Sequence, residues 1–210
     1  VLRLTASVAF GMRCLAPLLP AFRTAFPGLK LELILTDANL DLVAERIDLA
    51  IRLGPSVTAD VVGVKLFTTT YRVCASPAYL AKGVPLATPA DITQHSCLLF
   101  SLPEFRTRWL FRDQTGAMTE VPVHGDIVIS NAMALRDCAL SGLGPVLLAD
   151  WLISEDIKAR RLLDLFPCHQ VTATSFETAA WLLYPSRAFL PNKVRVTIDF
   201  LKAHLGKRRG

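Results

Sequence analysis

Long hydrophobic runs, paired cysteines and signal-peptide features are all missing from this 210-residue chain. No apolar run approaches the ~18 residues that a membrane-spanning helix requires, so the chain is not predicted to cross a bilayer. Its five cysteines lie far apart and form no Cys-x-x-Cys pair, which argues against a disulfide framework and favours a reducing compartment. The first residues carry neither a basic start nor a small-residue cleavage site. We therefore predict a cytoplasmic protein that makes no contact with a membrane.

Motifs that carry enzyme chemistry are also absent. The four histidines, at positions 95, 124, 169 and 204, show no metal-ligand spacing. The sequence has no Gly-x-Ser-x-Gly elbow, no phosphate-binding Gly-x-x-x-x-Gly-Lys-[Ser/Thr] loop and no Gly-x-Gly-x-x-Gly turn after a strand. Asp37, Asp41, Glu45 and Asp48 surround Arg46, and we interpret this group as a solvated helix face rather than a catalytic pair. We expect no metal, no cofactor and no catalytic residue, which favours a binding module.

The composition is that of a globular protein. With 52% hydrophobic and 20% charged residues, the sequence is neither a disordered tail nor a coiled coil. The net charge of +5 would suit an anionic partner if the basic residues were clustered, but most of them are scattered singly. Only residues 207–209 form a basic run, which we interpret as part of a frayed C-terminal tail, 207–210.

Strand-like and helical segments alternate from end to end, a pattern typical of an α/β fold with a mostly parallel sheet. In the first part we expect a helical stretch after Ser7 that Pro27 and Gly28 end, with Pro20 kinking it unless the regular part begins near Cys14. The Pro- and Gly-rich stretch 76–89 predicts the start of a different lobe. Strands are expected at 2–6, 29–36, 49–53, 64–67, 71–75, 98–101, 109–112, 121–124, 127–130, 145–148, 161–164 and from 178. Helices are expected at 40–46 with Asn39 as cap, and at 77–82, 132–141, 150–157 and about 194–205.

Five segments carry a resemblance to a known family. They are LTASVAFGMRCLAPLLPAFRTAFPGLKLEL at 4–33, ERIDLAIRLG at 45–54, RVCASPAYLAKGVPLATPADITQHSCL at 72–98, SNAMALRDCALSGLGPVLLADWL at 130–152 and LLYPSRAFLPNKVRVTIDFLKAHL at 182–205. Taken in this order, they resemble the effector-binding domain of LysR-type transcriptional regulators, a version of the type 2 periplasmic binding protein fold. The turn at 158–161 departs from this family because Arg160 and Arg161 stand where such domains usually carry a glycine.

The resemblance implies two Rossmann-like subdomains joined by a two-strand hinge, the first made of residues 1–72 and 178–206 and the second of 73–177. It implies a small-molecule effector, anionic or aromatic, in the cleft between the lobes. It also implies that a winged helix-turn-helix, absent from this chain, precedes Val1 and carries the DNA contact. Family members dimerise antiparallel, so 15–26 is expected to meet 132–141 of a second copy, with a tetramer left open for the full-length protein. Leu15, Leu18, Leu19 and Phe22 offer apolar surface for this, unless all of them belong to the core.

Candidate ligand-binding residues follow from the strand ends and from the resemblance. Ser7 precedes a helix without a Glu or Gln three positions on, so the hydroxyl and the amides that begin at Val8 are expected to be free for an anion, unless Ser7 is only a cap. The resemblance adds Thr36, Ser101 and Asn131 at the cleft. Phe10 and Phe100 are expected to sandwich an apolar ligand body or to serve ordinary packing, and Arg52 to pair with a ligand carboxylate or with Asp48.

Two alternatives stay open at this point. An extracytoplasmic solute-binding protein would share the fold, although five unpaired cysteines argue against it. An enzyme on the same two-lobed scaffold is the second alternative, because fold alone does not decide function.

Overall fold

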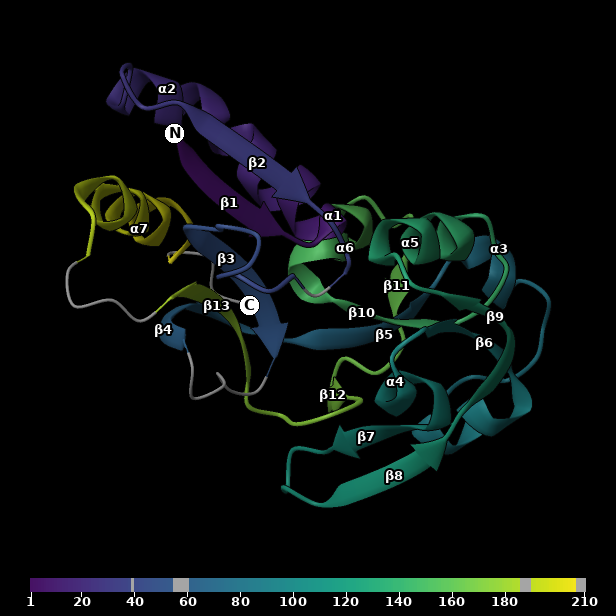
Figure 1. Ribbon diagram of the computed structural model, residues 1–210. Coiled ribbons are helices and arrows are strands. Elements are labelled where there is room, and N and C mark those ends of the chain that lie inside the picture. The colour runs from purple at the N-terminus through teal and green to yellow at the C-terminus, as the bar shows by residue number, and fades with distance from the viewer. Residues whose placement is uncertain (39, 55–60, 186–189, 207–210) are drawn as a thin grey trace. The chain divides into compact units, whose positions relative to one another are not determined.

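The computed structural model describes residues 1–38, 40–54, 61–185 and 190–206, and they fall into two compact units (Figure 1). The first unit combines Val1–Thr69 with Glu177–Gly210, and the second is Thr70–Phe176. The chain therefore passes between the units twice. The basic tail at 207–210 lies outside the described residues, as does the expected cap Asn39.

The first unit is built on a five-stranded sheet of order β2-β1-β3-β13-β4. β1 pairs in parallel with β2 and β3, while β13 runs antiparallel to β3 and β4. Alternating apolar residues drive β1, because Leu2, Leu4 and Ala6 are buried on one face. The bounds are β1 Leu2–Ala6, β2 Leu31–Leu35, β3 Leu49–Gly54, β4 Val61–Thr69 and β13 Thr178–Pro185.

One irregular helical run follows β1, and a longer helix closes the first unit. The run ends before Pro27, as predicted, and its prolines lie in first turns, where the missing N–H is not needed. Phe22 and Phe26 pack against Phe200 of the last helix, with ring centroids 5.3 and 5.9 Å from that of Phe200. The elements are α1 Val8–Phe10, the π-helix η1 Gly11–Leu15, the 3₁₀ turn η2 Ala16–Leu18, α2 Leu19–Ala25 and α7 Asn192–Leu205.

Residues 40–46 do not form the predicted helix. The Asp41 carboxylate accepts hydrogen bonds from the amides of Val43 and Ala44, at 2.8 and 3.0 Å, and so caps a single turn. These two hydrogen bonds lower the pKa of Asp41, Ala44 contributing more. Arg46 then adopts a left-handed φ of 51°, which stops the turn from propagating. The predicted helix is therefore replaced by one turn, which the Asp41 side chain caps and Arg46 ends.

The second unit is built on a sheet of order β8-β7-β12-β5-β10-β6-β9, with β11 paired to β5. β10, β6 and β9 run parallel, and the other pairs are antiparallel. Both sheets are thus more mixed than the mostly parallel sheet expected, because β13 in the first sheet, and β5 and β7 in the second, run against their neighbours. The bounds are β5 Tyr71–Ala75, β6 Ser96–Phe100, β7 Arg108–Arg112, β8 Met118–Pro122, β9 His124–Ile129, β10 Val146–Ala149, β11 Leu163–Asp164 and β12 Gln170–Thr172.

Five short helices accompany this second sheet among the described residues. The core beneath them centres on Trp109 and Phe111, each 1% exposed. Arg160, in the turn at 158–161, has a left-handed φ of 54°. None of the described helices is long and apolar enough to cross a bilayer. The helices are α3 Pro77–Leu80, η3 Pro89–Gln94, α4 Pro103–Thr107, α5 Ala132–Leu140 and α6 Asp150–Lys158.

We predict that Gly125→Ala destabilises the second unit. The β6–β9 register shifts between Ser96 and Leu98, and an added Cβ at Gly125 would lie 1.8 Å from the backbone oxygen of Cys97. A backbone atom cannot move aside cheaply, so we expect a loss of about 1–3 kcal/mol or more in urea unfolding. Gly28→Ala is the control, because nothing lies within 4 Å of its Cβ position. Equal unfolding midpoints for the two variants would contradict this packing argument.

Candidate functional site

The first unit places hydroxyl side chains at the carboxyl ends of two adjacent parallel strands. Ser7 directly follows β1 and Thr36 directly follows β2, and these strands pair through Ala6 and Leu35 at this end. The amide of Thr36 donates to the Ala6 carbonyl at 3.0 Å, which extends the pairing. In open α/β sheets, ligands lie at the carboxyl ends of parallel strands. The structure therefore brings Ser7 and Thr36 together at an edge suited to binding.

The helix entrance after Ser7 is not free, in contrast to the expectation from the sequence. The Val8 amide donates to Oδ1 of Asp37 at 3.1 Å, and the Phe10 amide donates to Oγ of Ser7 at 3.4 Å. Ser7 is therefore an N-cap, and a carboxylate of the protein stands where an anion was expected. Sequence reasoning missed Asp37, which it interpreted as part of a solvated face.

Two further expected residues of the first unit have different surroundings. Phe10 is 1% exposed and stacks near Phe67, with ring centroids 6.2 Å apart, an environment that agrees with ordinary packing. Arg52, near the end of β3, does not pair with Asp48, because Asp48 accepts from Nζ of Lys193 at 2.6 Å and from the Arg3 amide at 3.0 Å. Of the two partners considered for Arg52, the internal one is thus excluded.

The second unit repeats the arrangement of polar residues after parallel strands. Ser101 follows β6, and its amide donates to the Ile129 carbonyl at the end of β9 at 3.0 Å. Asn131 lies two positions beyond β9, where its Oδ1 accepts from the Ala134 amide at 3.0 Å and caps α5. Ser101 and Asn131 therefore occupy the carboxyl ends of adjacent parallel strands, as Ser7 and Thr36 do in the first unit.

Aromatic rings line the Ser101 side of this edge. Phe100 is half-buried and meets Phe105 edge to face at 5.7 Å, and Phe105 meets Tyr71 at 5.9 Å. Burial raises the pKa of Tyr71 to about 12, so the phenol stays neutral at physiological pH. Phe100 is thus only partly buried, whereas Phe10 is fully buried.

Buried ion pairs hold the helix that carries Asn131. Asp156 on α6 has a fully buried carboxylate, which accepts two hydrogen bonds from Arg136 of α5 at 2.6 and 2.7 Å and two from Arg161 at 2.8 and 3.0 Å. Burial alone would raise the pKa of Asp156, but the hydrogen bonds from both guanidinium groups outweigh it and lower the pKa. The pair locks α5 against α6.

A second ion-pair network fixes the central strand β5 to the same helix. Nε of Arg72 donates to Asp150 at the start of α6, and Nη1 donates to Asp164 on β11, both at 2.5 Å. Burial opposes the charge of Arg72, but both carboxylates favour it and raise its pKa. The scaffold beneath the second-unit edge is therefore rigidly connected.

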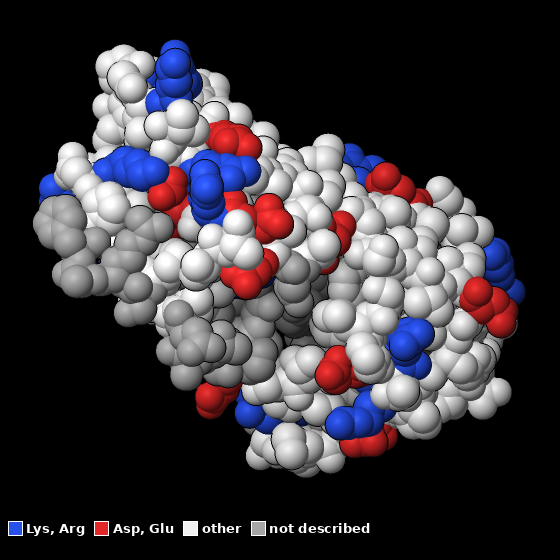
Figure 2. Space-filling model, viewed as in Figure 1, with Lys and Arg blue, Asp and Glu red and all other residues white. Residues whose placement is uncertain are grey.

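The described residues contain no group of three His, Cys, Asp or Glu side chains arranged to hold a metal ion. On the face shown in Figure 2, basic and acidic side chains are interspersed, in agreement with the scattered charge of the sequence. The site chemistry described above consists of hydroxyl, amide, aromatic and guanidinium groups.

The family of the chain follows from comparison with known proteins. The sequence matches the sequence model of the LysR substrate binding domain over residues 1–206. The chain belongs to this family. It is 31% identical over 208 residues to the HTH-type transcriptional regulator CrgA of Neisseria meningitidis serogroup B, with 98% of this chain and 67% of the relative covered. The HTH-type transcriptional regulator DmlR of Escherichia coli K12 is 29% identical over 208 residues, with 99% of this chain and 66% of the relative covered.

Among solved structures, the regulatory domain of CrgA from Neisseria meningitidis is similar to this chain, with a TM-score of 0.82 and 30% sequence identity. The match covers 97% of this chain and 98% of the CrgA domain. The chain thus spans about two thirds of the length of the regulators CrgA and DmlR. These matches confirm the family and its type 2 periplasmic binding protein-like fold, and they favour a regulatory domain over an extracytoplasmic solute-binding protein. The relatives are named as transcriptional regulators and not as enzymes.

We predict that Asp156→Asn lowers the free energy of unfolding of this LysR-family domain by about 3–5 kcal/mol at pH 7, because two guanidinium groups lose their buried counter-charge. The lowered pKa of Asp156 means that its contribution is present above the ordinary aspartate value near 3.8 and is lost as pH falls through the folded-state value. The difference between wild type and variant should therefore shrink in urea unfolding below about pH 4.

Glu155→Gln is the matched control for this test. Glu155 is the next residue on α6, and its pair with Lys158 at 3.2 Å is about 70% exposed on both sides. Exposed pairs of this kind contribute little, so the control should unfold as the wild type does. A loss in the control as large as in Asp156→Asn would contradict the importance of burial.

Proposed function

We propose that this chain is the effector-sensing part of a LysR-type transcriptional regulator and that it binds a small anionic or aromatic metabolite without catalysing a reaction. The observation that carries the proposal is that each unit places two polar residues at the carboxyl ends of adjacent parallel strands. These are Ser7 and Thr36 in the first unit and Ser101 and Asn131 in the second. We propose that the two lobes, 1–72 with 178–206 and 73–177, each carry one of these groups of polar residues. Control of DNA binding belongs to the further residues of a whole regulator.

The strand edges favour ligand binding over other functions for a physical reason. Ser and Thr hydroxyls both donate and accept hydrogen bonds, and an Asn amide offers two donors beside its acceptor. A sensor needs a ligand that binds two conformations with different affinity, and such a difference typically corresponds to about 1–3 kcal/mol. Five cysteines without disulfides agree with the cytoplasmic location that the proposal includes.

The proposal predicts ligand-dependent thermal stability. A metabolite at a hundred times its Kd adds about 2.7 kcal/mol, which corresponds to roughly 5–10 °C in Tm for a chain of this size. We expect at least one compound in a panel of small organic acids and aromatic compounds to raise Tm in differential scanning fluorimetry. Ser7→Trp should lose this shift, whereas Thr119→Trp, on the exposed strand β8, should keep it. Failure of every compound, or equal shifts in both variants, would argue against the proposal.

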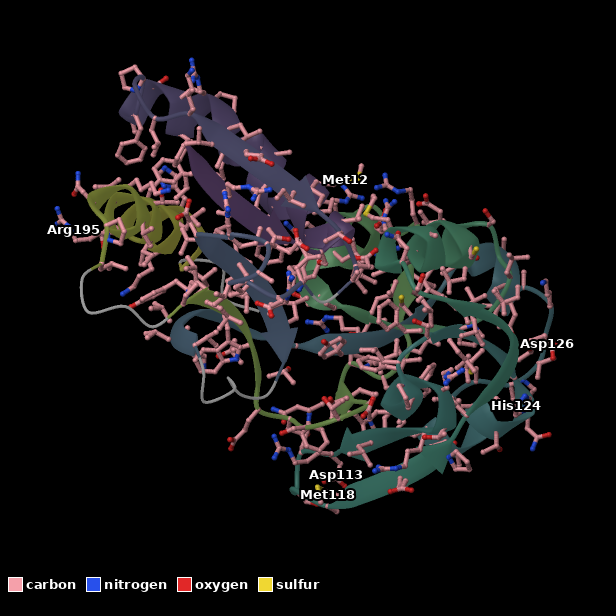
Figure 3. The ribbon with its side chains drawn as sticks, viewed as in Figure 1. Met12, Asp113, Met118, His124, Asp126 and Arg195 are labelled. Carbon is pink, nitrogen blue, oxygen red and sulfur yellow. The ribbon has the colours of Figure 1, made fainter. Side chains whose placement is uncertain are left out.

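We also propose that two copies associate through the helical run of the first unit and α5. Leu15 and Phe22, which the sequence analysis assigned to the interface, are each only 4% exposed and belong to the core of their own unit. Leu18 and Leu19 line an apolar pocket on the same inner side. Met12 is 51% exposed and is labelled in Figure 3. Ala16 and Pro20, which follow it at four-residue spacing, are also exposed, and the three residues form a stripe.

Association through this stripe predicts that Met12→Asp converts the dimer to a monomer, because a charge would be placed in an apolar interface. Sedimentation velocity at micromolar concentration measures the change. Met118→Asp is the control, because Met118 is 70% exposed on β8, outside the proposed interface (Figure 3). A wild-type chain that is monomeric at all concentrations, or two variants that behave alike, would exclude this dimer.

A further inference from the structure

Arg52 is a partly buried arginine that has no carboxylate partner among the described residues. Its Nη1 donates to the carbonyl of the preceding residue, Ile51, at 3.1 Å. Its Nη2 is buried and has no hydrogen-bond partner among the described residues. Burial lowers the pKa of Arg52, and no carboxylate counteracts this. In contrast, Arg72 and Arg136 are both paired with aspartates, and the pKa of each is raised.

The surroundings of Arg52 form a polar strip on one face of the first sheet. Residues two apart on a strand share a face, so Arg52 lies on the same face as Ala50, which is paired with Thr5 of β1. Thr5 is fully buried, and its hydroxyl also lacks a partner among the described residues. Two buried polar groups with unused hydrogen-bonding capacity therefore lie near each other, toward the carboxyl end of β1 and β3.

An aromatic side chain adjoins the strip. Trp181 of β13 is the register partner of Arg52, so the two side chains emerge side by side on the same face. The indole Nε1 donates to the Gly54 carbonyl at 3.0 Å, which anchors Trp181 against the end of β3. A guanidinium beside an anchored indole offers both a charge and a flat apolar surface to a bound molecule.

We propose that Arg52 recognises a carboxylate group of the effector and thereby makes the sensed metabolite an organic acid. This rests on the proposed function and narrows its ligand class. A planar guanidinium matches a carboxylate with parallel N–H···O bonds, and Nη2 is a donor that no described protein group uses. Asp48, the acidic residue nearest in sequence on the same strand side, is already bound by Lys193 and the Arg3 amide.

The test compares carboxylates with their neutral amides on the 210-residue chain. Acetate, succinate and benzoate are titrated at constant ionic strength and pH 7, beside acetamide, succinamide and benzamide, with Tm as the readout. We expect a carboxylate to raise Tm where its amide does not. Arg52→Met should weaken that apparent affinity roughly 10- to 100-fold, and Arg52→Lys should restore part of it. Arg195→Met, an exposed arginine of α7, should respond as the wild type does (Figure 3).

A second measurement needs no ligand. An unpaired, partly buried guanidinium does not stabilise the fold, so Arg52→Met without ligand should have a Tm equal to or above that of the wild type. A clearly lower Tm would show that Arg52 serves packing, and would overturn the proposal. Equal carboxylate shifts in wild type and Arg52→Met, equal shifts from acids and amides, or no shift from any of the three acids would overturn it too.

The two proposals fail separately. If neutral compounds raise the Tm of both wild type and Arg52→Met, but not that of Ser7→Trp, the sensing function stands and the role of Arg52 is excluded. If no compound raises Tm, both proposals fail.

Discussion

Charge that is withdrawn from water needs an opposite charge or strong hydrogen bonds, and this requirement organises both units of the protein. In the second unit, Asp156 is completely buried and remains ionised only because two arginines surround it. Arg72 joins a strand to the start of a helix through two aspartates in the same way. Such pairs contribute less to net stability than their geometry suggests, since desolvation opposes them. Their larger effect is on specificity, because only one relative position of β5, α5 and α6 satisfies every charge.

This rigid connection helps to position the polar residues at the carboxyl ends of the strands. Asn131 caps α5, and Ser101 follows a strand paired with the one that leads into α5, so the ion pairs that fix this helix also fix the positions of both side chains. In the first unit the corresponding connection is lighter. The Asp37 carboxylate ties the end of β2 to the first amide of the helical run, at an exposed position. The first edge is therefore held by hydrogen bonds, among them the exposed contact between Val8 and Asp37, and the second by ion pairs to a buried carboxylate, which leaves the first edge easier to rearrange.

The parts of this structure that could be predicted from the sequence are those decided by local pattern. The alternation of Leu2, Leu4 and Ala6 predicted β1 with its bounds, and Pro27 with Gly28 predicted the end of the helical run. The family could be recognised because its motifs are contiguous. The contacts that could not be predicted join residues that are distant in the sequence. Asp37 accepts a hydrogen bond from the Val8 amide, 29 positions away, and Asp156 accepts one from Arg136, 20 positions away. Nothing local in the sequence marks either aspartate, and only strand register and helix packing show which group each one contacts.

Arg52 illustrates why absence of a partner is harder to predict than its presence. The sequence offered a ligand carboxylate or Asp48 as counter-charge, and a choice required knowing that Lys193, 145 residues away, already engages Asp48. With Asp48 assigned, the Nη2 of Arg52, which has no partner among the described residues, becomes informative, because burial without compensation costs free energy that the fold does not recover. A ligand that supplies the missing charge removes that cost only when bound. Ligand binding then favours the conformation in which Arg52 contacts the carboxylate, and a sensor requires such a difference between conformations.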